Sequence, residues 1–69
     1  MAYFIEVTKM AGVKTYFGKD LEEIFYPLNK VKAEWGFTEQ SSADHHIDEV
    51  NARCVLMGMA IAAVSVVEK

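Results

Sequence analysis

The stretch that decides the fold is residues 3–17, YFIEVTKMAGVKTYF, which contains two alternating runs separated by a short connection. Successive side chains of a β-strand point to opposite faces, so a run that alternates has one face more apolar than the other. In the first run the apolar face holds Tyr3, Ile5 and Val7. Gly12 in the connection is free to adopt a positive φ, as tight turns require. This stretch therefore predicts an antiparallel β-hairpin.

Residues 20–35 follow the hairpin and have the spacing of a helix. Asp20 and Glu23 form the pattern of a capping box. Apolar residues recur at intervals of three and four, at Leu21, Ile24, Leu28, Val31 and Trp35. Pro27 lacks a backbone N–H, so we expect the helix to be kinked there, or to begin there after a single turn. Gly36 is expected to end the helix as a left-handed cap, with Trp35 largely buried.

Residues 43–66 predict a long helix. Its apolar stripe consists of Ile47, Val50, Cys54, Met57, Ile61 and Val64. From Cys54 onward the segment is apolar on every side. In the alternative interpretation, Gly58 ends the helix and residues 60–67 form a third strand. The valines of that segment favour a strand and its alanines favour a helix, and we expect the helix.

The fold class that follows is α+β, in one small domain over residues 1–69. Its expected order is ββαα: an N-terminal antiparallel hairpin, a Pro-interrupted short helix and a long apolar C-terminal helix. Of the 69 residues, 52% are hydrophobic and 25% are charged, a composition that excludes a disordered chain. The net charge of −3 offers no basic excess for a nucleic acid.

The cellular compartment is also suggested by the sequence. The single cysteine, Cys54, excludes an intrachain disulfide, and the N-terminus lacks the pattern of a signal peptide. No run of 18 apolar residues is present to cross a membrane. These features predict a protein of the reducing cytoplasm that does not associate with membranes.

Residues 44–49, DHHIDE, form the one cluster that could carry chemistry. On a helix, His45 and Glu49 share a face and supply two ligands, whereas a stable metal site needs three or four. We therefore expect a solvated, acidic helix start without metal or cofactor. Cys54 lies on the apolar stripe, which predicts a buried and inert thiol. No catalytic residue is assigned, and the protein is not expected to be an enzyme.

Five residues are candidates for a protein interface. Phe4 and Tyr16 lie on the mixed face of the hairpin and would contact a partner if that face stays open. The other three lie on the apolar C-terminal segment: Met57, Ile61 and Val64. A helix over residues 43–66 would be about 36 Å long and overhang a domain of this size. We therefore expect an antiparallel homodimer through this helix.

The predicted function is that of a small acidic protein-binding module, a regulator or inhibitor that acts without catalysis. The expectation rests on small size, acidic charge, the missing catalytic constellation and abundant apolar surface. Small regulators of this kind include those of phages and other mobile elements, so a viral origin belongs to the prediction. The alternative function is a structural or accessory subunit of a larger assembly.

Overall fold

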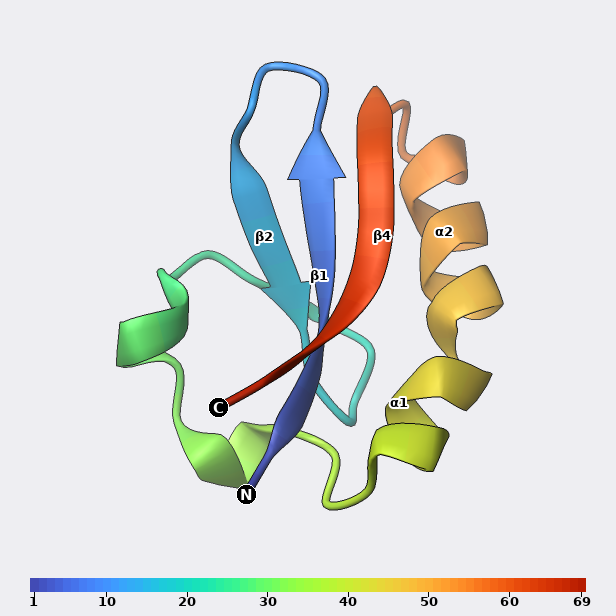
Figure 1. Ribbon diagram of the computed structural model, residues 1–69. Helices are drawn as coiled ribbons and strands as arrows, with labels where there is room; N and C mark the ends of the chain where they lie inside the picture. Colours follow the sequence, from blue (N-terminus) through green and yellow to red (C-terminus); the bar gives the residue numbers. More distant parts are fainter.

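The computed structural model describes residues 1–69 and shows an α+β domain with a four-stranded antiparallel sheet in the order β3-β2-β1-β4 (Figure 1). The strands are β1 (Tyr3–Lys9), β2 (Lys14–Phe17), β3 (Glu23–Ile24) and β4 (Ile61–Glu68). The α-helices are α1 (Gln40–His45) and α2 (Ile47–Leu56), and two 3-10 helices are η1 (Leu28–Lys30) and η2 (Ala33–Trp35). The two chain ends lie close together, because Ala2 and Lys69 exchange both backbone hydrogen bonds.

The predicted hairpin is confirmed. β1 and β2 pair antiparallel, with Ile5 opposite Phe17 and Val7 opposite Thr15. Gly12 in the connection has a φ of 87°, a region that other residues avoid. The local alternation was sufficient for this prediction, because a two-strand unit with a short turn depends on neighbouring residues only.

Apolar side chains fill both faces of the sheet. The first cluster lies between the sheet and the two α-helices and contains Ile5, Val7, Phe17, Leu21, Phe37, Ala43, Val50 and Cys54. The second cluster lies on the opposite face, where the segment with η1 and η2 covers it, and contains Ala2, Phe4, Tyr16 and Val31. Figure 1 shows the corresponding arrangement, with α1 and α2 beside β4 and the 3-10 segment at the other side of the sheet. The mixed face of the hairpin is therefore not open.

The helix predicted over residues 20–35 is wrong. Leu21 adopts a left-handed φ of 60°, after which the chain enters the short strand β3 and pairs with β2. Pro27 is extended, with a ψ of 154°, and precedes η1. The residue before a proline avoids helical geometry, which adds to the break. Gly36 has a φ of −88°, so it is not a left-handed cap.

The long C-terminal helix is also wrong, and the alternative third strand after Gly58 is confirmed. α1 and α2 are separated at His46, and Gly58, with a φ of 76°, lies in the turn after α2. β4 then pairs antiparallel with β1 along nearly its whole length. The central strand β1 has two edges that need hydrogen bonds, and β2 satisfies only one. The hydrogen bonds along the second edge of β1, together with the β-branched residues of 61–68, outweigh the helix propensity of the alanines.

The helical surface expected to form the dimer does not exist, because no helix extends from Ala43 to Val66. The apolar residues of the C-terminal segment are instead divided between the two faces of the sheet. Val64 and Val66 pack against the first cluster, and Val67 packs against the second. None of the helices has the length and hydrophobicity required to span a bilayer.

Candidate functional site

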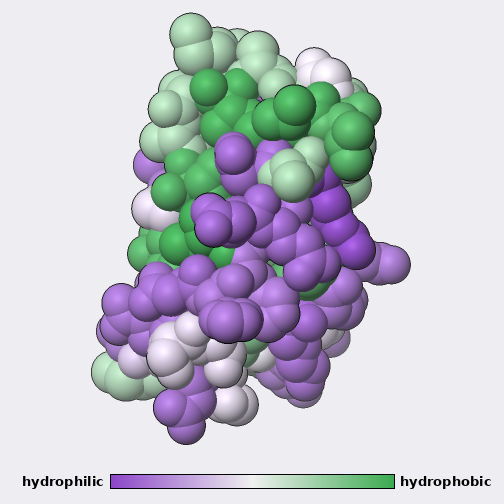
Figure 2. All heavy atoms as spheres, turned by 90° about the vertical axis from the view of Figure 1, so that its right-hand side faces the viewer, coloured by the Kyte–Doolittle hydropathy of each residue, from purple (hydrophilic) through white to green (hydrophobic).

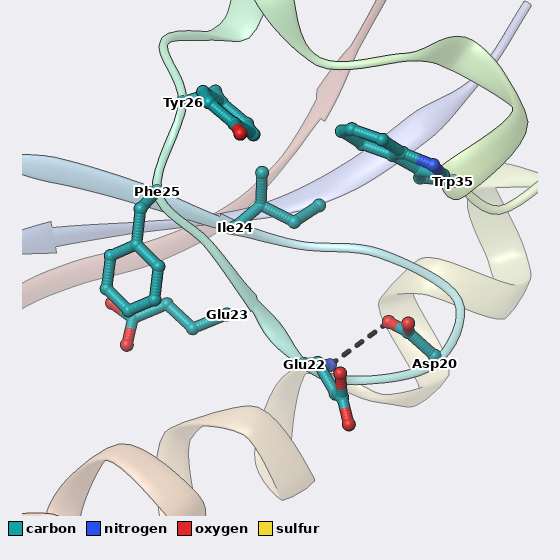
Figure 3. Close-up of a pocket in the computed structure, with 7 residues that line it drawn as sticks. All are labelled: Asp20, Glu22, Glu23, Ile24, Phe25, Tyr26 and Trp35. Carbon is teal, nitrogen blue, oxygen red and sulfur yellow. Dashed lines mark hydrogen bonds between the residues drawn. The ribbon is translucent and has the colours of Figure 1, made fainter.

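An open pocket of about 370 Å³ lies where the chain leaves β2 and passes through β3 (Figure 3). The side chains that line it are of two kinds, aromatic or aliphatic and acidic. They are Asp20, Glu22, Glu23, Ile24, Phe25, Tyr26 and Trp35. Six of the seven belong to one continuous segment, residues 20–26, and Trp35 comes from the end of η2.

The segment over residues 20–26 is fixed by the burial of Leu21 and by two hydrogen bonds. Leu21 holds a left-handed conformation that costs a non-glycine residue about 1–2 kcal/mol, and its side chain is buried in the first cluster. The Arg53 Nη1 atom of α2 donates a hydrogen bond to the Leu21 carbonyl oxygen at 2.8 Å. The Glu22 N–H donates to Asp20 Oδ1 at 3.1 Å, the dashed line of Figure 3. These contacts keep Asp20 and Glu22 at the pocket.

Trp35 is held by its backbone rather than by deep burial of its ring. The Lys19 N–H donates to the Trp35 carbonyl oxygen at 2.9 Å. Gly18 lies so close that a Cβ atom at this position would stand 2.2 Å from the same oxygen. The Trp35 ring is half-buried against the second cluster, so the expectation that it would be largely buried is met only in part. The exposed part of the ring forms a wall of the pocket.

The aromatic side of the pocket contains rings that are accessible to solvent. Tyr26 and Trp35 lie nearly parallel, with ring centroids 6.3 Å apart and an angle of 24° between the planes. Phe25 is 77% exposed and Tyr26 is 57% exposed. Figure 3 shows Ile24 between the two rings and Phe25 on the other side of the pocket. Exposed aromatic residues beside a cavity are typical of recognition surfaces.

Two of the three acidic residues of the lining, Asp20 and Glu22, form the acidic side of the pocket. Asp20 and Glu22 are exposed and form no ion pair within the protein, whose three ion pairs use Glu6, Glu23 and Glu49. The Glu23 side chain points to the face of the sheet that carries the first cluster, because Glu23 pairs with Phe17. It is only 8% exposed, and its Oε2 atom forms an ion pair with Lys9 Nζ at 3.6 Å but has no hydrogen bond. A carboxylate oxygen this buried is usually hydrogen-bonded.

Two of the five predicted interface residues are buried, so that prediction is wrong for Phe4 and Tyr16. Phe4 has no exposed surface, because the 3-10 segment covers its face of the sheet. The Tyr16 hydroxyl donates to Glu6 Oε2 at 3.1 Å. Burial, together with this hydrogen bond and the charge of Glu6, raises the pKa of Tyr16.

The other three predicted interface residues lie apart from the pocket. Ile61 and Val64 are half-buried in β4 and pack against the first cluster. Met57 is exposed, next to Val55 and Leu56 at the end of α2, and we call these three residues the apolar tip. Figure 2 shows hydrophobic residues gathered at the upper end of this side of the molecule, and hydrophilic residues below them. Only the apolar tip retains the surface that the sequence indicated for the C-terminal segment.

The cluster at residues 44–49 does not form one helix face. His45 ends α1 and Glu49 belongs to α2, and His46 Nδ1 donates to the Ser42 carbonyl oxygen at 2.8 Å. No group of three or more His, Cys, Asp or Glu side chains is placed to hold a metal ion. Cys54 is fully buried, and burial, followed by the charge of Glu23, raises the pKa of its thiol.

The structure thus shows a small α+β domain with an aromatic and acidic surface pocket. No family model, curated protein or solved structure matches the chain. The sequence contained a signal for this site that the helix interpretation concealed. Three acids precede two consecutive aromatic residues and a proline in residues 20–27, a composition that suits an exposed irregular segment.

Proposed function

We propose that this protein is a small acidic protein-binding module that acts as a regulator or inhibitor without catalysis, and that the pocket at residues 20–26 is its binding surface. The observation that carries the proposal is the exposure of Phe25 and Tyr26 beside the pocket. Most large apolar side chains of a small domain are needed in its core. Leaving two neighbouring aromatic rings in water therefore favours a role in recognition.

The rigidity of the surrounding backbone supports this proposal. Leu21 keeps a left-handed conformation in the segment that lines the pocket, and Arg53 holds its carbonyl oxygen from a different element. Strained residues that the surrounding structure fixes in place occur preferentially at binding sites. A fixed pocket also loses less entropy when it binds than a mobile loop does.

The cytoplasm as the site of action and a phage or mobile-element origin remain parts of this proposal. Support for the compartment comes from Cys54, a free and buried thiol. A homodimer through a C-terminal helix is not part of the proposal, because residues 61–68 form a strand.

Affinity capture from cells that express the natural protein tests the proposal. The tagged chain is compared with a double variant, Phe25→Ala and Tyr26→Ala, which removes the exposed rings. We expect a specific protein to be retained by the natural chain and lost with the double variant. Val13→Ala is the matched control, since Val13 is an exposed apolar residue of the hairpin loop outside the pocket.

Equal retention of the same protein by the natural chain and the double variant would refute the pocket as the binding surface. Both variants should first be shown to unfold at nearly the same denaturant concentration as the natural chain. Exposed positions contribute little to stability, so a change within about 0.5 kcal/mol is expected.

The second candidate function, an accessory subunit of a larger assembly, is favoured by the apolar tip. Leu56 is 87% exposed, and Val55 and Met57 are exposed beside it. Three exposed apolar residues in sequence form a patch suited to burial by another chain. If this function is correct, Leu56→Ser should abolish retention of the partner, whereas the pocket double variant should leave it unchanged.

A further inference from the structure

We propose that the pocket at residues 20–26 receives an arginine side chain of the partner protein. This inference rests on the proposed function, and it adds the chemistry of the group that is recognised. Its basis is the combination of two carboxylates without an ion pair and exposed aromatic faces at one cavity.

The charge of the pocket favours a cation. Three of its seven lining residues are acidic and none is basic. Asp20 and Glu22 are exposed without an ion pair in the protein. One oxygen of Asp20 accepts the Glu22 N–H, which leaves the second oxygen and both Glu22 oxygens available to a ligand. These carboxylates repel one another until a positive charge lies among them.

Glu23 also lines the pocket, but its carboxylate takes no part in the proposed recognition. Glu23 pairs with Phe17 in the sheet, so its side chain points to the face that carries the first cluster. There it is buried and forms an ion pair with Lys9. The carboxylates available to a ligand are therefore those of Asp20 and Glu22.

The aromatic side of the pocket is also suited to a cation, and one cation–π contact is already present within the protein. Lys32 Nζ lies 5.7 Å from the centroid of the Trp35 ring, within the range of a cation–π contact. Tyr26 lies nearly parallel to the same ring and contributes a second aromatic face. Aromatic faces combined with carboxylates are the chemistry by which proteins recognise organic cations.

Arginine fits this combination better than lysine. Its planar guanidinium stacks on an aromatic face and donates two parallel hydrogen bonds to a carboxylate at the same time. The lysine ammonium is a strongly hydrated point charge that cannot stack. The pocket offers both partners, since Figure 3 places the rings of Tyr26 and Trp35 on one side and Asp20 and Glu22 on another.

Titration with blocked tripeptides tests the inference, with the fluorescence of Trp35 as the readout. Trp35 is the only tryptophan of the chain and forms a wall of the pocket. The probes are Gly-Arg-Gly, Gly-Lys-Gly and Gly-citrulline-Gly, where citrulline has the shape of arginine without its charge. We expect saturable binding of the arginine peptide, weaker binding of the lysine peptide, and at least about tenfold weaker binding of the citrulline peptide.

The variant Asp20→Asn with Glu22→Gln removes two charges and keeps the side-chain shapes. Asparagine retains an oxygen that can accept the Glu22 N–H, so the backbone of the segment is preserved. We expect this variant to bind the arginine peptide at least about tenfold more weakly. Asp48→Asn, on α2 outside the pocket, is the control and should bind like the natural chain.

Equal binding of the arginine and citrulline peptides, or no saturable response to the arginine peptide, would overturn the inference. Unchanged affinity in the Asp20 and Glu22 variant would overturn it as well. These failures are distinguishable from failure of the proposed function. Partner capture that still depends on Phe25 and Tyr26 would retain the pocket as a protein-binding surface with a different preferred ligand.

Discussion

Substitution of Gly18 by alanine should displace Trp35 and deform the pocket from behind. A Cβ atom at Gly18 would stand 2.2 Å from the Trp35 carbonyl oxygen and 3.2 Å from its carbonyl carbon. Real Cβ contacts are essentially never shorter than 3.0 Å, so the backbone at Trp35 must retreat by about 0.8 Å. The obstacle is a backbone atom, so no flexible side chain can rotate away to relieve the contact.

The cost of Gly18→Ala combines two contributions. Overpacking of a tightly packed position costs about 1–3 kcal/mol. The hydrogen bond from the Lys19 N–H to the Trp35 carbonyl oxygen, 2.9 Å long, is stretched by the same movement, and its loss costs about 1 kcal/mol. The total of about 2–4 kcal/mol corresponds to a decrease in Tm of roughly 10–30 °C for a domain of this size.

Urea unfolding and Trp35 emission, measured on the same samples, test this prediction. We expect lower stability and a changed emission maximum in the folded state of Gly18→Ala. Gly58→Ala is the control. Gly58 has a φ of 76° and open space around it, so alanine there costs about 1–2 kcal/mol of strain and leaves Trp35 in place. A Gly18→Ala protein with natural stability and natural emission would refute the close approach on which the position of Trp35 depends.

Further predictions concern the core, the ionisable groups and the anchor of the pocket. Phe4→Ala should cost about 3–5 kcal/mol in urea unfolding, whereas Phe25→Ala should cost less than about 0.5 kcal/mol; equal costs would contradict the assigned burial. The pKa values of Cys54 and Tyr16 are raised, so the unfolded state loses these protons first. Their contribution to stability should be complete below pH 9 and fall as the pH rises above it, and a midpoint unchanged to pH 11 would contradict this. Arg53→Gln should lower the free energy of unfolding by about 1–3 kcal/mol and change the emission of Trp35. An unaltered emission spectrum would show that Arg53 does not hold the pocket in place.

The hairpin could be predicted from the sequence because its information is local. The alternation of Ile5 and Val7 with polar neighbours, followed by Gly12, specifies two strands and a turn without reference to other segments. The C-terminal segment could not be predicted in the same way. Its alanines and valines support helix and strand almost equally, and the free edge of β1 decides between them. That edge becomes relevant only when residues more than fifty positions apart in sequence meet.

The pocket was missed for a related reason. Asp20 and Glu23 match a capping box, and the apolar residues that follow match a helical stripe. The conformation of Leu21 breaks this pattern, because a left-handed residue cannot lie in a right-handed helix. It is held by the contact from Arg53, a residue 32 positions away, and by burial in the core. Without the helix, Asp20 and Glu22 lie at the same cavity as the aromatic rings of this segment.

Site-specific photocrosslinking from the pocket is the most direct test of the claim that the protein acts by binding another protein there. A photoreactive phenylalanine analogue replaces Phe25, whose side chain is exposed at the pocket, and in a second sample replaces the exposed Asp48 on α2. The account predicts that irradiation of intact cells joins the Phe25 sample to a discrete partner protein, and that the Tyr26→Ala change suppresses this product. A partner that crosslinks from position 48 and never from position 25 would contradict the account.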